Sequence, residues 1–111
     1  MRKLTLCVRT LVSVAIRIPE WGYKVHGHDV EVEACFSSVE RIDIETLRSL
    51  LTAIASQFDH KPLWETIGEG ALIEDMLSEI CKALRERAPS AVRLEQVEAK
   101  FPGARIIADC A

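Results

Sequence analysis

The sequence predicts an α+β fold in which two helices cover one face of a four-stranded antiparallel sheet. Three observations support this prediction. The N-terminal third alternates apolar and polar side chains over two long stretches, the middle carries two segments with helical spacing, and two short alternating segments follow. Alternation indicates strands with one buried face, and helical spacing indicates amphipathic helices. The order is β-β-α-α-β-β without repeat or linker, so residues 1–111 are expected to form a single domain.

The two N-terminal strands are predicted to be long. From Leu4 to Ile18 the even positions are almost all apolar and the odd positions are more polar, so this strand buries one face. Pro19 ends it. A second strand runs from about Val25 to Phe36, and Ser37-Ser38 breaks it.

Two amphipathic helices are predicted in the middle of the chain. Asp43 is typical of an N-cap, and apolar residues follow it at helical spacing. A polar loop with Lys61-Pro62 and Gly68-Glu69-Gly70 separates the two helices, and the second stops before Pro89. The apolar faces consist of Leu47, Leu50, Leu51, Ile54 and Phe58 in the first helix, and of Ile73, Met76, Leu77, Ile80 and Leu84 in the second.

Two short strands complete the predicted sheet. They run from Val92 to Glu98 and from Arg105 to Cys110, with a hairpin signal around Phe101-Pro102-Gly103. The two long strands are expected to leave a polar outer face and free edges, which favours pairing between copies. The sequence therefore predicts a ring-like homo-oligomer.

Composition and charge exclude several function classes. The 14 Lys and Arg residues against 17 Asp and Glu residues give a formal net charge of −3, so nucleic acid is not an expected partner. No apolar run reaches the roughly 20 residues of a membrane helix. The N-terminus superficially suggests a signal peptide, but its alternation and the absence of a small-residue cleavage site indicate a strand. We therefore expect a soluble, cytoplasmic protein with no membrane partner.

The 4 cysteines are widely spaced and include no Cys-x-x-Cys pair, which excludes a zinc knuckle or a thioredoxin-type motif. Reduced, partly buried thiols are the expected state. If the first two strands pair with residue numbers that sum to 42, Cys7 lies opposite Cys35. A bridge between these two residues stays open as an alternative.

Two short motifs could carry chemistry. In His26-Gly27-His28 the histidines are two residues apart on a strand, so both imidazoles project toward the future core side and can reach one metal ion. Zinc normally takes at least three protein ligands, so the alternative is a pair of surface or interface histidines. In Asp59-His60 the carboxylate can fix the tautomer of the histidine and make it a general base. The alternative is a histidine favoured by the dipole at the end of the helix.

Three carboxylates are further candidates. Glu74 lies near the start of the second helix, where an acidic side chain also complements the helix dipole. Glu95 and Glu98 are expected on opposite faces of the third strand, where one carboxylate could accept two hydrogen bonds from a guanidine-like ring edge. The alternative for both is a solvated strand face.

The order of the motifs resembles the 6-pyruvoyltetrahydropterin synthase and 6-carboxytetrahydropterin synthase family. The resemblance covers about Val12 to Glu98 and is most specific at the two histidine motifs. It implies the tunnelling fold, in which trimers form a barrel and two trimers stack, with active sites at subunit interfaces. The matching segments are His26-Gly27-His28, Val39 to Ile44, Asp59 to Leu63 and Ala71 to Glu74.

The resemblance also implies an activity and a set of roles. A family member would be a zinc-dependent carbon–oxygen lyase acting on 7,8-dihydroneopterin triphosphate. By position, His26 and His28 match two zinc ligands, and Asp59 and His60 match the pair that moves protons. Glu74 matches the glutamate that opens the second helix. Glu98 best matches the glutamate that anchors the pterin, although Gln96 and Glu95 are alternative matches for that role.

The sequence departs from the family pattern at three places. Ile16 stands where the first zinc histidine belongs, and isoleucine cannot coordinate zinc. No cysteine lies between Pro19 and His26, so Glu20 or Tyr23 would have to replace the catalytic cysteine. Trp64 replaces an asparagine that usually follows the Asp-His motif.

Three hypotheses follow from these matches and departures. The first is a divergent pterin-processing lyase that uses the two histidine motifs, with Glu20 as an acid or base. The second is an inactive homologue that kept the homo-oligomer, a trimer or hexamer, and binds a pterin or purine. The third is an oligomeric scaffold without a small ligand. Fold alone does not choose among them.

Overall fold

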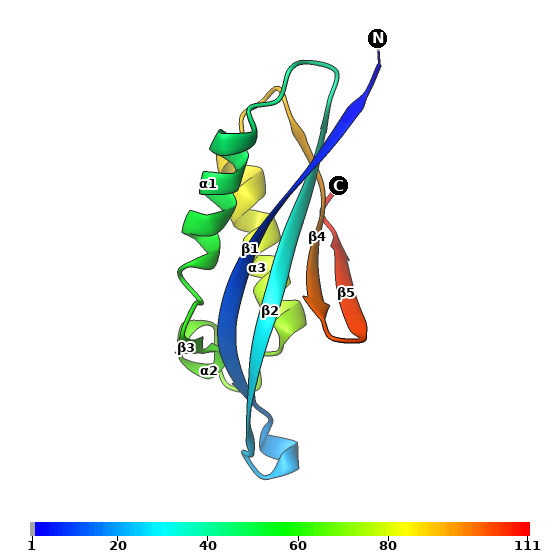
Figure 1. The fold of residues 1–111 in the computed structure, drawn as a ribbon. Helices are drawn as coiled ribbons and strands as arrows, with labels where there is room; N and C mark the ends of the chain where they lie inside the picture. The colour runs from blue at the N-terminus through cyan, green and yellow to red at the C-terminus, as the bar shows by residue number, and fades with distance from the viewer. Residues whose placement is uncertain (1) are drawn as a thin grey trace.

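The fold is a twisted sheet with helices packed on one face (Figure 1). A computed structural model describes residues 2–111. The elements in chain order are β1 (Leu4–Arg17), the short 3₁₀ helix η1 (Pro19–Trp21), β2 (Val25–Ser38), α1 (Ile44–Ala55), β3 (Lys61–Pro62), α2 (Leu63–Thr66), α3 (Ile73–Arg87), β4 (Arg93–Phe101) and β5 (Ala104–Asp109). The predicted α+β class and the β-β-α-α-β-β order of the main elements are confirmed.

The sheet has five strands in the order β3-β1-β2-β4-β5, rather than the predicted four. The additional strand is Lys61–Pro62, which pairs in parallel with Val14 and Ala15 of β1, while the other pairs are antiparallel. Two residues are too few for a period-two pattern, so only a loop is predicted for this segment. The short strand matters because it places the segment that follows α1, which contains Asp59 and His60, beside β1.

The register of β1 and β2 is the one in which paired residue numbers sum to 42, the condition stated for a contact between Cys7 and Cys35. Ile16 lies opposite His26 and Cys7 lies opposite Cys35. The predicted break at Ser37-Ser38 is wrong, because β2 continues through both serines, which pair with Thr5 and Leu4. Ser37 donates a hydrogen bond of 2.8 Å to Glu95, so a polar residue is satisfied inside the sheet.

A β-bulge changes the faces of two candidate carboxylates. The pairing of β2 with β4 shifts between Cys35 and Phe36, which gives β4 one extra residue, Glu95. Glu95 accepts its hydrogen bond from Ser37, and Glu98 lies opposite Glu33. Both carboxylates therefore lie on the same face of the sheet, and the prediction of opposite faces is wrong.

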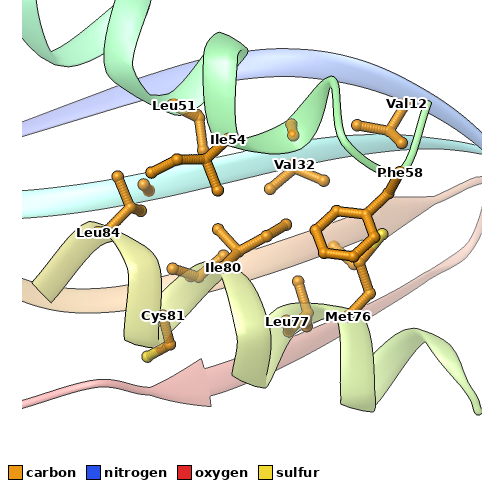
Figure 2. Packing of buried hydrophobic residues seen from close by; sticks show 14 of the residues in the cluster. Val12, Val32, Leu51, Ile54, Phe58, Met76, Leu77, Ile80, Cys81 and Leu84 are labelled. Carbon is orange, nitrogen blue, oxygen red and sulfur yellow. The ribbon is translucent and has the colours of Figure 1, made fainter. Parts of the chain in front are cut away.

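The two faces of the sheet differ in what covers them. The face that packs against α1 and α3 is called the covered face, and the opposite face is called the open face. Figure 2 shows Leu51 and Ile54 of α1 meeting Ile80 of α3 above Val32 of β2. The side chains of Phe36, Leu47, Leu77, Met76 and Leu84 are likewise fully buried in this core. Phe58 also packs there, although α1 ends at Ala55.

The helix ends follow the sequence signals. Asp43 caps α1 because its carboxylate accepts hydrogen bonds from the amides of Glu45 and Thr46, as predicted. At the start of α3, Asp75 accepts a 2.8 Å hydrogen bond from the amide of Leu72. The helix ends at Arg87, before Pro89.

All 4 cysteines form disulfides, so the prediction of reduced thiols is wrong. Cys7 and Cys35 are joined across β1 and β2 on the open face, with Cα atoms 4.0 Å apart. Cys81 of α3 is joined to Cys110 after β5, with Cα atoms 5.8 Å apart, on the covered side. Spacing along the chain does not reveal oxidation, which depends on which sulfur atoms meet in space.

The edges of the sheet are free over much of their length. Within residues 2–111, β5 pairs only with β4, and β3 covers only two residues of the outer edge of β1.

The molecule is elongated, 54 × 26 × 20 Å, because the β1–β2 hairpin extends beyond the helices (Figure 1). In the described part of the chain, no helix has the length and apolar character needed to cross a membrane.

Candidate functional site

A depression on the open face lies where β1, β2 and β3 meet. Ala15 and Gly27 are directly opposite each other on β1 and β2, and the single methyl group of Ala15 beside the bare Gly27 backbone leaves the sheet surface hollow. A side chain built on Gly27 would meet no atom within 4 Å. The depression has a volume of about 550 Å³, and its lining includes His28, His60, Lys61 and Trp64. His60 lines it directly, whereas the His28 ring is directed to the covered side, where it packs on Phe101.

Asp59 and His60 form a close pair at one wall of the depression. His60 adopts a left-handed backbone conformation with φ of 58°. Its amide donates a 2.7 Å hydrogen bond to the carbonyl of Ser13, and the amide of Ser13 donates a 2.8 Å bond to Asp59 Oδ1. These contacts with β1 hold Asp59 Oδ1 3.0 Å from His60 Nδ1. When Nδ1 donates to the carboxylate, Nε2 is left as a proton acceptor.

The exposure of this pair suits proton transfer. The His60 side chain is 77% exposed and that of Asp59 is 39% exposed. An accessible imidazole oriented by a carboxylate is the arrangement that general acid–base catalysis requires. Whether these residues act on a substrate stays a prediction.

Trp64, which also lines the depression, is stacked against a cation. The guanidinium of Arg17 lies 4.4 Å from the ring centre of Trp64 and 5.6 Å from that of Tyr23. Two hydrogen bonds of 2.8 Å join Arg17 to Glu69. The hydrogen bond from Arg17 lowers the pKa of Glu69 below its ordinary value, and the bond to Glu69 raises the pKa of Arg17. The Arg17 side chain is therefore held between aromatic rings, and the Glu69 carboxylate neutralises its charge.

Sequence reasoning missed the Ser13–Asp29 pair on the open face beside the depression. Ser13 Oγ donates a 2.7 Å hydrogen bond to Asp29 Oδ1. The register of β1 and β2 predicts this contact, because Ser13 lies opposite Asp29. The stacking of Arg17 on Trp64 has no such signal, since the two residues lie far apart in the sequence.

The histidine pair of β2 does not fit a zinc site. Ile16 lies opposite His26 and is 9% exposed, so an apolar side chain fills the position of the third ligand. His28 packs edge-to-face on Phe101, with ring centres 5.7 Å apart. Within residues 2–111, three suitable ligand atoms lie within 4.8 Å of one another only at Cys7, Glu33 and Cys35, and both sulfur atoms there are in a disulfide.

Glu98 is the candidate substrate-binding residue with the most unusual surroundings. It is 3% exposed, and its Oε1 atom has no hydrogen-bond partner among the described residues. Arg105 Nη1 lies 3.4 Å from Oε1, within ion-pair range. The competing residues are placed differently, since Glu95 is bound by Ser37 and Gln96 lies opposite Cys35.

Glu20 and Glu74 are not brought to the depression. Glu20 is exposed in η1, and Glu74 is exposed in the first turn of α3. Neither residue lines the hollow around Ala15 and Gly27. Their predicted roles as catalytic and substrate-binding residues stay predictions.

The helix-covered sheet with its β-β-α-α-β-β order defines an α+β protein of the tunnelling-fold type. Among solved structures, the chain is similar to 6-pyruvoyl tetrahydropterin synthase from Caenorhabditis elegans, with a TM-score of 0.81, 16% identity, and coverage of 98% of this chain and 96% of that chain. It is also similar to an uncharacterized protein from Wolinella succinogenes, with a TM-score of 0.71, 16% identity, and coverage of 98% and 99%.

Neither a protein-family model nor a curated protein matches the sequence. The structural similarity nevertheless shows that the chain has the fold of 6-pyruvoyl tetrahydropterin synthase, as the motif order predicted. Likeness at 16% identity shows the fold, while substrate and activity depend on the site residues.

Proposed function

We propose that the protein binds a dihydropterin, or a purine-like ring of the same hydrogen-bonding pattern, at an interface between copies of the chain. The observation that carries this proposal is the Glu98 carboxylate, which is 3% exposed and has one oxygen atom without a hydrogen bond among the described residues. A buried carboxylate whose oxygen has an ion pair but no hydrogen bond is costly, so Glu98 marks a place where a ligand can supply the missing donors.

The chemistry of Glu98 selects the ligand class. A carboxylate accepts two parallel hydrogen bonds from a planar edge that carries adjacent N–H groups. The amino-pyrimidine edge of a pterin or a guanine has this pattern. Arg105, which lies 3.4 Å from Oε1 and has a side chain that is 66% exposed, can swing away when such an edge binds.

Glu98 and His60 are too far apart to contact one small ring within a single chain. Glu98 lies opposite Glu33 on β2, and the depression lies near Asp29, four residues along the same strand. Four strand residues span about 13 Å, and β4 lies one strand further from the wall that carries His60. A site that uses both residues is therefore completed by a second copy.

The exposed apolar residues of the edge strands support association of copies. Leu11 of β1 is 74% exposed and Ile107 of β5 is 48% exposed. Both lie on the open face, because Leu11 is opposite Glu31 and Ile107 is opposite Glu98. Free edges with apolar side chains favour pairing with another strand. A trimer or hexamer follows from the resemblance and stays part of the proposal.

Catalysis as a carbon–oxygen lyase is a second candidate function. It is favoured by the 3.0 Å contact between Asp59 Oδ1 and His60 Nδ1, which suits proton transfer. The family's zinc chemistry is not part of this candidate, because Ile16 replaces a ligand beside His26. Glu20 in the hairpin loop, the acid or base expected from the sequence, does not line the depression, so it would take part only if it reached the site of another copy.

The proposed site is tested by binding of 7,8-dihydroneopterin, followed by calorimetry or by fluorescence. We expect saturable binding by the wild-type protein and a loss of roughly 30-fold or more, about 2 kcal/mol, in Glu98→Gln. Glu95→Gln is the matched control, because Glu95 lies on the same face but already accepts a hydrogen bond from Ser37. Equal affinity in Glu98→Gln and in the wild type would overturn the proposal.

Turnover of 7,8-dihydroneopterin triphosphate separates the two candidate functions. A lyase would consume this substrate and lose activity in His60→Gln, whereas a binding protein would leave it unchanged.

The single-domain prediction for residues 1–111 and the cytoplasmic prediction stay predictions. Two disulfides are uncommon in the cytoplasm outside hyperthermophiles, so the redox state in the native host is the observation that decides the compartment.

A further inference from the structure

We infer that reduction of the Cys7–Cys35 disulfide creates a binding site for a thiophilic divalent cation such as zinc, with Glu33 as the third ligand. This site lies on the open face and is separate from the histidines of β2. It is independent of the pterin-binding proposal, because neither Glu98 nor the depression takes part in it.

The strand register supplies the geometry. Cys7 and Cys35 are directly opposite each other on adjacent antiparallel strands, with Cα atoms 4.0 Å apart. In a tetrahedral zinc site with Zn–S bonds of 2.3 Å, the two sulfur atoms lie about 3.8 Å apart. A disulfide bond is about 2.05 Å long, and we expect rotation about the Cα–Cβ bonds of the reduced residues to supply the additional separation.

Glu33 is placed to complete the ligand set. It precedes Cys35 by two residues and therefore projects from the same face of β2. Its Oε1 atom lies 3.8 Å from Cys35 Sγ, and one ligand atom from each of the three residues lies within 4.8 Å of the others. That spacing is close to the separation of neighbouring ligands around zinc.

Two cations hold the other oxygen atom of Glu33. Lys100 Nζ lies 3.1 Å from Oε2, and Arg9 Nε lies 3.0 Å from the same atom. These contacts fix the orientation of the carboxylate and leave Oε1 directed toward the cysteines. Metal ligands are commonly oriented in this way by neighbouring hydrogen-bonding groups.

The site is open on one side. Cys7 is exposed, whereas Cys35 is 8% exposed and Glu33 is 9% exposed. A reductant and a metal ion can therefore reach the sulfur atoms from the Cys7 side. The other disulfide, Cys81–Cys110, belongs to the buried core and has no third ligand group near it within residues 2–111. It is a natural control within the same chain.

The reaction requires a reductant, which we take to be a dithiol. The dithiol transfers two electrons and two protons, so its own sulfur atoms form a disulfide while Cys7 and Cys35 become thiols. Binding of the divalent cation then releases both thiol protons and forms two metal–thiolate bonds and one metal–carboxylate bond. A water molecule completes four-coordination.

Cobalt(II) titration tests the site, because cobalt bound to thiolates has a charge-transfer band that histidine sites lack. We expect about one cobalt per chain, with this band, in protein reduced by a dithiol, and no band in oxidised protein. The paired variant Cys7→Ser with Cys35→Ser is expected to abolish the band. Cys81→Ser with Cys110→Ser is expected to retain it.

Glu33→Gln separates a three-ligand site from a simple dithiol. We expect the thiolate band to remain while the affinity falls at least about tenfold. His26→Ala with His28→Ala is expected to change neither the band nor the affinity. Unchanged affinity in Glu33→Gln, or a band that survives loss of Cys7 and Cys35, overturns the assignment. Circular dichroism of each variant shows that it is folded.

Discussion

The covered and open faces of the sheet use the same strands but bury very different residues. On the covered face, β2 contributes Val30, Val32 and Phe36, all fully buried beneath the helices. On the open face, the alternate positions bury Glu33, and the neighbouring strand buries Glu98. Apolar burial stabilises a fold directly, whereas a buried carboxylate costs free energy unless donors surround it. The covered face therefore carries stability, and the open face carries the candidate chemistry.

The largest expected effect comes from the covered face. Phe36→Ala removes a fully buried aromatic ring and should lower the free energy of unfolding by about 4 kcal/mol. Chemical denaturation monitored by circular dichroism measures this change. Ile107→Ala on the open face, where the side chain is 48% exposed, is the control and should cost no more than about 0.5 kcal/mol. A comparable loss in both variants would break the distinction between the faces.

The two disulfides provide a matched comparison, one on each face. Their sequence separations, 28 and 29 residues, are nearly equal, so loop-closure entropy predicts about 3.5 kcal/mol for each. Replacing Cys7 and Cys35 with serine, or Cys81 and Cys110 with alanine, should cost about this much in denaturation experiments. We expect the second pair to cost more, because it also loses contacts within the core. A loss below about 1 kcal/mol for either pair contradicts the entropic estimate.

A smaller effect is expected at Glu98, although it is nearly as buried as Phe36. Glu98→Gln removes a charge whose Oε1 atom lacks a hydrogen bond, so stability should stay within about 1 kcal/mol of the wild type or rise. Thermal unfolding without ligand measures it. Destabilisation by more than about 2 kcal/mol would show that Glu98 is a structural residue rather than one kept for a ligand.

The smallest effect concerns the Arg17–Glu69 pair at the rim of the depression. The hydrogen bond from Arg17 lowers the pKa of Glu69 from its ordinary value of 4.5. The stabilisation is therefore complete above pH 4.5 and is lost as the pH falls through the lowered pKa. Trp64 fluorescence, measured in a Trp21→Phe background, should change over this acid range. The control Glu69→Gln should abolish that change, and an identical titration in both proteins would contradict the assignment.

The sequence predicts the parts of the fold that depend on local patterns. Alternation locates β1 and β2, their register places Ile16 opposite His26, and Asp43 marks the start of α1. It misses β3, because two residues cannot show a period, and it misses the bulge at Glu95, because one extra residue inverts the expected face. Short-range patterns thus fix the elements, but not the irregular places where they meet.

The candidate site is less predictable, for a physical reason. Asp59 and His60 are adjacent in sequence, so their pairing follows from a short motif, and structure adds only that Ser13 orients them. The burial of Glu33 and Glu98 depends on Arg9, Lys100 and Arg105, which arrive from other strands. Stacking of Arg17 on Trp64 also joins distant segments. Such long-range contacts leave no periodic signal in the sequence.

The covalent link between Cys7 and Cys35 also acts on the sliding of β1 against β2. A slip of one residue would invert every side chain of β1, and a slip of two would keep the faces but place a different residue opposite His26. The bond forbids both movements, since it ties one position of each strand together. Ile16 is thereby held opposite His26, because a single covalent bond between paired positions fixes the register along the whole length of the β1–β2 hairpin.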